Sequence, residues 1–218
     1  RVLKVPFQGE EMESGLRAAQ MTAGWLGPKV FEQDPETGAL LMERLVPGTP
    51  LGDWPMSDQV GFEIVAGFLE RYWQMNSESL MPIDEYYSTP SPLALELLRT
   101  ATDRRPLHGD LHPYNVLRHG ETWVPIDPKG LVGDPCFEPS AFLRNCLAEG
   151  GTEALRAQLV RRIDWFALRL RLDPDRVTAW FWVDRVDALE DEDDQLSARP
   201  LIEAMRPIIE RTRFSSFA

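Results

Sequence analysis

The first fifty residues combine short apolar runs with one amphipathic stripe. Residues 2–5, 30–32 and 39–42 are mainly apolar and of strand length. Between the first two runs, small and apolar residues recur at the spacing of one helix face: Met12, Gly15, Leu16, Ala19 and Ala23. The pattern predicts three strands and a helix over about residues 10–23. Asp, Pro and Gly gather at residues 34–38, so the last two strands should form a hairpin.

Residues 46–50, which hold two Pro and one Gly, separate this region from a mainly helical one. We expect them to lack regular structure. Cap residues followed by helical spacing of apolar positions predict helices that begin near residues 57, 91 and 173. Residues 107–136 differ, because short apolar runs alternate there with polar turn residues. The sequence therefore predicts an α+β protein whose mainly helical part carries one β-rich insertion.

The composition narrows the possible partners. The 218 residues are 43% hydrophobic, enough for a sizeable core, and no apolar run approaches the ~18 residues of a membrane span. Thirty-five Asp and Glu against 23 Lys and Arg give a formal net charge of -12. Such a surface repels phosphate backbones and anionic lipids and attracts cations. We therefore expect neither nucleic acid nor a membrane as a partner.

The two cysteines suggest a reduced compartment. Cys136 and Cys146 are too few for a disulfide framework and match no zinc spacing. We expect both to be buried, small apolar side chains. Because no signal peptide opens the chain, a cytoplasmic protein is the simplest interpretation.

The candidate chemistry lies in the β-rich insertion. Asp110 and Asn115 stand five residues apart, and Asp127 follows twelve residues after Asn115. The intervening segment has the pattern of a hairpin, which would return Asp127 to the neighbourhood of Asn115. Carboxylate and amide oxygens suit Mg²⁺, and Asp110 could accept the proton of an attacking hydroxyl. This spacing is that of the catalytic loop and metal-binding Asp of kinases.

His108 and His112 flank Asp110 and allow two interpretations. They could bind a metal or act in acid–base chemistry. We instead expect a structural role, in which imidazoles hydrogen-bonded to carbonyl groups of the loop hold Asp110 in place.

Residues 108–115 and the following 127–130, Asp-Pro-Lys-Gly, resemble the aminoglycoside phosphotransferase family of antibiotic kinases, which are related to protein kinases. The run 123–135 is most similar to the streptomycin 6-phosphotransferase and hydroxyurea kinase branch. The resemblance implies a protein-kinase-like two-lobe fold. It also implies ATP-dependent O-phosphorylation of a small cationic acceptor, an aminoglycoside of the streptomycin type, with Mg²⁺ as cofactor.

The resemblance assigns roles in the chemistry. Asp110 would be the catalytic base, and Asn115 and Asp127 would hold Mg²⁺ on the nucleotide phosphates. Lys4, on its strand, would contact the phosphates and pair with Glu13.

The resemblance also implies binding residues. Residues 42–45 would form the hinge between the lobes, where Glu43 and Leu45 offer backbone groups to adenine. Beyond what the resemblance assigns, we expect acidic residues of the C-terminal lobe to bind a cationic acceptor, with Glu138, Asp184 and Asp187 as candidates.

The same resemblance divides the chain into a remnant of the nucleotide-binding lobe with its hinge (1–47) and a helical C-terminal lobe with the catalytic loop and acceptor site (48–218). The chain opens inside a strand and without Met, so we expect a truncated N-terminal lobe whose Gly-rich phosphate loop would precede Arg1. Two alternatives remain. The chain could be a kinase for hydroxyurea or another small metabolite, or a non-catalytic ligand-binding remnant if the Gly-rich loop is absent.

Overall fold

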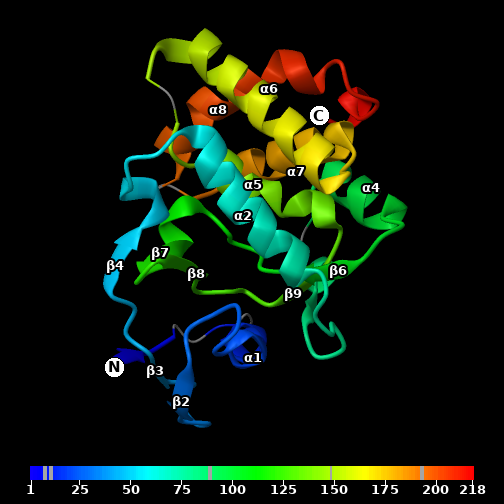
Figure 1. Ribbon diagram of the computed structural model, residues 1–218. Coiled ribbons are helices and arrows are strands. Elements are labelled where there is room, and N and C mark those ends of the chain that lie inside the picture. The colour runs from blue at the N-terminus through cyan, green and yellow to red at the C-terminus, as the bar shows by residue number, and fades with distance from the viewer. Residues whose placement is uncertain (7–8, 10–11, 88–89, 148, 192–193) are drawn as a thin grey trace. The chain divides into compact units, whose positions relative to one another are not determined.

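A computed structural model describes residues 1–6, 9, 12–87, 90–147, 149–191 and 194–218 (Figure 1). The chain forms two compact units, each built from two segments of sequence. The first unit comprises Arg1–Tyr86 and Arg104–Gly133, and the second comprises Tyr87–Asp103 and Asp134–Ala218. These units are groups of residues that contact one another, and they are not the two predicted lobes. The expected lobe boundary after residue 47 stays a prediction.

The described residues of the first unit form short strands and α-helices. Its elements are β1 (Val2–Lys4), α1 (Met12–Thr22), β2 (Val30–Gln33), β3 (Leu40–Met42), β4 (Pro47–Pro50), α2 (Asp58–Tyr72), β5 (Met81–Pro82), α3 (Ile83–Tyr86), β6 (Arg105–Leu107), β7 (Val116–His119), β8 (Thr122–Pro125) and β9 (Leu131–Gly133). The strands form three sheets with the orders β1–β3–β2, β4–β7–β8 and β5–β9–β6.

Helix α1 packs on the antiparallel sheet β1–β3–β2. Ala19 of the helix lies against Leu40 and Met42 of the central strand, with Leu16 and Val30 at the edge of this cluster. The predicted strands and the helical stripe are thus confirmed. Residues 10 and 11, where the helix was expected to begin, lie outside the described residues.

The β4–β7–β8 sheet contains both a confirmed and a wrong prediction. Strands β7 and β8 form the expected hairpin, in which Val116 is opposite Pro125. Residues 46–50 do not lack regular structure, because Pro47 and Pro50 lie in β4 and are paired with β7. A strand at the edge of a sheet tolerates proline, since its outward-facing positions need no N–H donor.

The second unit is helical. Its elements are α4 (Pro92–Thr100), α5 (Pro139–Leu143), α6 (Gly151–Leu170), α7 (Pro174–Asp187) and α8 (Gln195–Ile209). Helix α7 packs against the other four (Figure 1). Its Trp180 and Phe181 side chains are completely buried. Asp173 caps α7 by accepting hydrogen bonds from the N–H groups of Asp175 and Arg176, as the sequence predicts. Among the described residues, no helix is long and apolar enough to cross a membrane.

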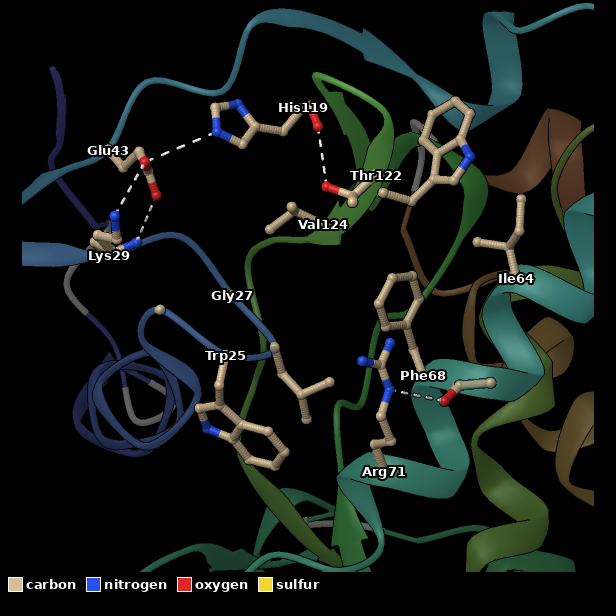
Figure 2. Close-up of a pocket in the computed structure, with 14 residues that line it drawn as sticks. Trp25, Gly27, Lys29, Glu43, Ile64, Phe68, Arg71, His119, Thr122 and Val124 are labelled. Carbon is tan, nitrogen blue, oxygen red and sulfur yellow. Dashed lines mark hydrogen bonds and ion pairs between the residues drawn. The ribbon is translucent and has the colours of Figure 1, made fainter.

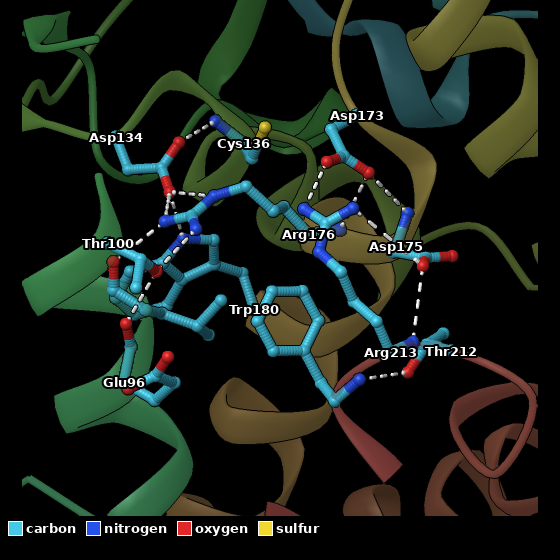
Figure 3. Close-up of polar contacts among 12 residues, drawn as sticks. Glu96, Thr100, Asp134, Cys136, Asp173, Asp175, Arg176, Trp180, Thr212 and Arg213 are labelled. Carbon is cyan, nitrogen blue, oxygen red and sulfur yellow. Dashed lines mark hydrogen bonds and ion pairs between the residues drawn. The ribbon is translucent and has the colours of Figure 1, made fainter. Parts of the chain in front are cut away.

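A buried ion pair joins the segments of the second unit (Figure 3). Asp134 Oδ2 accepts hydrogen bonds from Arg176 Nε and from Trp180 Nε1, both at 2.8 Å. The same guanidinium donates to Thr100 Oγ1 at 2.8 Å and to the carbonyl oxygen of Leu97 at 2.7 Å. Asp134, α4 and α7 therefore share one network from which water is largely excluded.

The two cysteines differ. Cys136 is buried as expected, and burial, with the nearby Asp134 carboxylate, raises the pKa of its thiol to about 12. Cys146 is exposed, so the prediction that it is buried is wrong. It follows α5 in a loop, where its backbone has a positive φ of 52°.

Replacing Arg176 with Met should destabilise the second unit by about 3–5 kcal/mol, because it leaves the Asp134 carboxylate buried without its partner. Arg213→Met is the matched control. Its pair with Asp173 is solvent-exposed, with 53% of the Arg213 side chain accessible, and such pairs contribute about 1 kcal/mol or less. Chemical denaturation of both variants measures the difference. Equal losses in the two variants would contradict a special role for the buried pair.

Candidate active site

The candidate catalytic loop leaves β6 and passes through a short 3₁₀ turn (Pro113–Asn115), and His108 anchors its start. The His108 side chain is completely buried. Its Nδ1 accepts a hydrogen bond from the N–H of Asp110 (3.3 Å), so Nε2 carries the proton and donates to the carbonyl oxygen of Ile126 (3.0 Å). Burial lowers the pKa of His108 to about 3, which keeps the ring neutral. The predicted bond from the His108 imidazole to a backbone carbonyl group is present, and the second contact is to the N–H of Asp110 instead.

The hairpin brings Asp127 back to Asn115. The N–H of Ile126 donates to the backbone carbonyl oxygen of Asn115 at 2.9 Å, one residue before Asp127. The side-chain amide of Asn115 donates to the backbone carbonyl oxygen of Asp110 at 3.0 Å. His112 Nε2 lies 3.7 Å from Asp110 Oδ2. The Asn115 side chain therefore contacts Asp110, and the hairpin brings the backbone next to Asp127 against that of Asn115.

Lys4 reaches Asp127 from β1. Its Nζ lies 2.6 Å from Asp127 Oδ1, across 123 residues of sequence, and both side chains are partly open to solvent. Asp127 has a φ of 58°, in the left-handed region that Asp tolerates better than most residues. Glu13 forms an ion pair with Arg17 on its own helix. Among the described residues the expected Lys4–Glu13 pair is therefore not formed, because Asp127 takes the ammonium group.

The close approach of α1 to residues 128–130 was not predicted from the sequence. Gly130 has a φ of 72°, and a Cβ there would overlap the carbonyl oxygen of Ser14. The Ser14 hydroxyl donates to the Gly130 carbonyl oxygen, and a Cβ on Gly15 would lie 3.0 Å from the carbonyl oxygen of Pro128. The sequence feature that could have indicated this contact is the group of small residues Ser14, Gly15 and Ala18 on one helix face. Such a face is typical of a helix that packs closely against another backbone segment.

A cavity of about 450 Å³ opens beside Lys4 and Asp127. Its lining includes all four predicted hinge residues, Met42, Glu43, Arg44 and Leu45. Glu13 is not part of the lining. The volume is within the usual range of small-molecule sites, so this cavity is the candidate nucleotide site.

One oxygen atom each of Asn115 and Asp127 is suited to a divalent cation. The amide nitrogen of Asn115 is engaged with Asp110, and its side-chain oxygen Oδ1 accepts no hydrogen bond from the described residues. Asp127 Oδ2 likewise has no partner there, while Oδ1 accepts from Lys4. The described part of the chain holds no group of three His, Cys, Asp or Glu residues placed for a metal. A nucleotide-bound Mg²⁺ needs none, because phosphates and waters complete its shell.

The three predicted acceptor-binding acids lie in the second unit and differ in their surroundings. Glu138 is buried, at 3% exposure. Asp184 pairs with Arg144 at 3.3 Å and with Arg185 at 2.7 Å, so its charge is already balanced. Burial, followed by the nearby acids, raises the pKa of Asp187 to about 6. Their role toward an acceptor stays a prediction.

The model of one protein family, described as aminoglycoside/hydroxyurea antibiotic resistance kinase, matches residues 1–188. The chain belongs to this kinase family. Streptomycin 3''-kinase of Klebsiella pneumoniae is 28% identical over 202 residues, which cover 83% of this chain and 74% of that protein. Hydroxyurea phosphotransferase of Kitasatospora aureofaciens is 32% identical over 177 residues, covering 70% and 50%. Streptomycin 6-kinase of Streptomyces griseus is 28% identical over 207 residues, covering 82% and 66%.

This chain thus spans between half and about three quarters of the length of these relatives.

Solved structures show the same fold. Choline kinase LicA from Streptococcus pneumoniae aligns with a TM-score of 0.59 at 15% identity, over 93% of this chain and 85% of that chain. A thermostable mutant of aminoglycoside phosphotransferase APH(4)-Ia, in a ternary complex with ADP and hygromycin B, aligns with a TM-score of 0.55 at 14% identity, over 94% and 93%. The predicted protein-kinase-like α+β fold is confirmed.

The buried His108 predicts a specific acid sensitivity. Its pKa is about 3 in the folded chain against an ordinary value of 6.5. Between these values the unfolded chain binds a proton that the folded chain does not, so stability falls as the pH is lowered. The slope from this one group is about 1.4 kcal/mol per pH unit.

Chemical denaturation between pH 7 and pH 4.5 tests this contribution. His108→Gln keeps one donor and one acceptor but cannot take up the proton, so its stability should fall less steeply than that of the unmodified chain. Parallel curves for the two proteins would show that His108 is not the group responsible.

Proposed function

We propose that this family member transfers the terminal phosphoryl group of ATP to a hydroxyl of a small cationic antibiotic of the streptomycin type. The observation that carries the proposal is the 2.6 Å contact between Lys4 and Asp127. It brings the strand lysine and the metal-binding candidate together at a cavity that the hinge residues also line. A cation and a hard oxygen ligand at such a place are what nucleotide phosphates require.

The proposed division of labour follows from the contacts. Lys4 binds a phosphate oxygen, and the backbone of Glu43 and Leu45 orients the adenine. Asn115 Oδ1 and Asp127 Oδ2 hold Mg²⁺, which, when bound, neutralises charge on the phosphates. Asp110, which is fixed by the His108 ring and by the Asn115 amide, accepts the proton of the acceptor hydroxyl. Catalysis is then mainly positioning and charge compensation.

Two observations support a cationic acceptor. Streptomycin kinases are among the relatives of this chain, and the chain carries a formal net charge of -12. Of the candidate acids, Asp187 has less balancing charge near it than Asp184, which pairs with two arginines. A kinase for hydroxyurea is the second candidate, because the hydroxyurea phosphotransferase is 32% identical to this chain.

Asp110→Asn should lower kcat by about 10²–10⁴-fold, because the amide cannot accept the hydroxyl proton. The KM for ATP should change little. The control is Asp164→Asn on the exposed face of α6, which makes the same change in charge. Steady-state assays with labelled ATP measure both variants. Unchanged kcat in Asp110→Asn would contradict the catalytic role.

Asp127→Ala should weaken the binding of Mg-ATP, because it removes both the metal ligand and the partner of Lys4. Isothermal titration calorimetry measures the affinity with and without Mg²⁺. Retained tight, Mg²⁺-dependent binding in the variant would argue against Asp127 as a metal ligand.

An acceptor panel with labelled ATP separates the proposed substrates. Streptomycin should be phosphorylated, and hydroxyurea should react poorly. Turnover of hydroxyurea alone would favour the second candidate. Binding of Mg-ATP without turnover of any acceptor would favour a non-catalytic ligand-binding protein.

A further inference from the structure

The first unit has a second cavity, of about 540 Å³, separate in its lining from the candidate nucleotide site except for Glu43. It lies among the loop that follows α1, the helix α2 and the β7–β8 hairpin. Trp25, Ile64, Phe68 and Val124 provide apolar and aromatic walls, and Figure 2 shows them around one common space. The volume suits a small molecule with one or two rings.

Of the charged groups that line this cavity, the Glu43 carboxylate has partners for its charge, whereas the Arg71 guanidinium has none for its terminal nitrogens among the described residues. Glu43 Oε1 lies 3.8 Å from Lys29 Nζ and 3.8 Å from His119 Nε2, and Glu43 Oε2 accepts from the N–H of Lys29 at 3.3 Å. The Glu43 carboxylate is therefore occupied. Arg71 donates through Nε to the carbonyl oxygen of Gly67 at 3.2 Å, and its terminal nitrogens have no partner among the described residues. The available charge in this cavity is thus positive.

Arg71 is also held in a fixed place. Its guanidinium carbon lies 4.8 Å from the centre of the Phe68 ring, and the Nε bond ties it to the preceding helical turn. Figure 2 shows the guanidinium beside Phe68, facing the space that Trp25 borders on the opposite side. A planar guanidinium in this setting can bind a carboxylate through two parallel hydrogen bonds.

Gly67 also lines the cavity, without a side chain. It lies inside α2, where glycine destabilises a helix by about 1 kcal/mol relative to alanine. No close backbone contact explains it, because a Cβ at this position would meet nothing within 4 Å. The space beside Gly67 is therefore open, and a larger side chain at this position would extend into it.

We propose that this cavity is a second ligand site, which binds a small aromatic carboxylate. The carboxylate pairs with the terminal nitrogens of Arg71, and the rings lie among Trp25, Phe68 and Val124. Such a ligand has the opposite charge to a streptomycin-type acceptor and does not occupy the candidate nucleotide cavity. The proposal is therefore independent of the proposed kinase reaction.

Calorimetry with 2-naphthoate as the probe tests the site. The protein should bind the carboxylate more tightly than the neutral 2-naphthamide, and a saturating non-hydrolysable ATP analogue should not displace it. Arg71→Gln should weaken naphthoate binding by about tenfold or more, the usual effect of losing a charge-assisted hydrogen bond. It should leave naphthamide binding unchanged. Gly67→Leu should abolish the binding of both compounds by filling the cavity, with its fold verified by thermal denaturation.

The matched control is Arg161→Gln. Arg161 donates to the carbonyl oxygen four residues earlier on α6, as Arg71 does on α2, but lies in the second unit. This variant should bind naphthoate like the unmodified protein. The proposal is overturned if naphthoate does not bind at millimolar concentration, if the ATP analogue displaces it, or if Arg71→Gln and Arg161→Gln bind it equally.

Discussion

The close packing of α1 against residues 128–130 is the constraint on which the candidate active site depends. No side chain fits at Gly130, since a Cβ there would overlap the backbone of Ser14. The Ser14 hydroxyl then bonds to the Gly130 carbonyl oxygen and fixes the helix on the turn. This places Asp127, three residues before Gly130, within reach of Lys4 on the sheet that α1 covers. A larger residue at Gly130 or at Gly15 would push α1 away from this turn. It would thereby separate Lys4 from Asp127 without contacting either residue.

A second set of contacts determines the position of Asp110. The neutral ring of His108 connects the loop backbone at Asp110 to the hairpin backbone at Ile126. The side-chain amide of Asn115 donates a hydrogen bond to the backbone carbonyl oxygen of Asp110. The backbone carbonyl oxygen of Asn115 accepts one from the N–H of Ile126. Each segment is thus fixed by polar backbone groups rather than by apolar packing alone. Buried polar networks of this kind hold one geometry, because every alternative leaves a donor or an acceptor unsatisfied.

The sequence predicts the elements and the hairpin contact better than the partners of individual side chains. Helical stripes, cap residues and the hairpin pattern are local signals, and a single hairpin brings the backbone next to Asp127 against that of Asn115. Lys4 could pair with either of two carboxylates, Glu13 or Asp127. Which one it contacts depends on how distant segments pack, and no local sequence pattern reveals this. The edge strand β4 was missed because its prolines argue against a strand unless its place in the sheet is known. The exposure of Cys146 depends on where the chain turns after α5, which composition does not reveal.

The interrupted order of the two units limits how this chain can be recombined. The segment Tyr87–Asp103 lies between the two halves of the first unit but belongs to the second, where Leu97 and Thr100 bond to Arg176. If this gene recombines once with a related gene at a point before residue 103, the first unit comes from two parents. If the crossover lies after residue 103, the second unit comes from two parents. Every one-junction hybrid therefore mixes two parents inside at least one core. Functional shuffling among relatives would have to exchange α4 together with the segment that follows β9, as paired inserts.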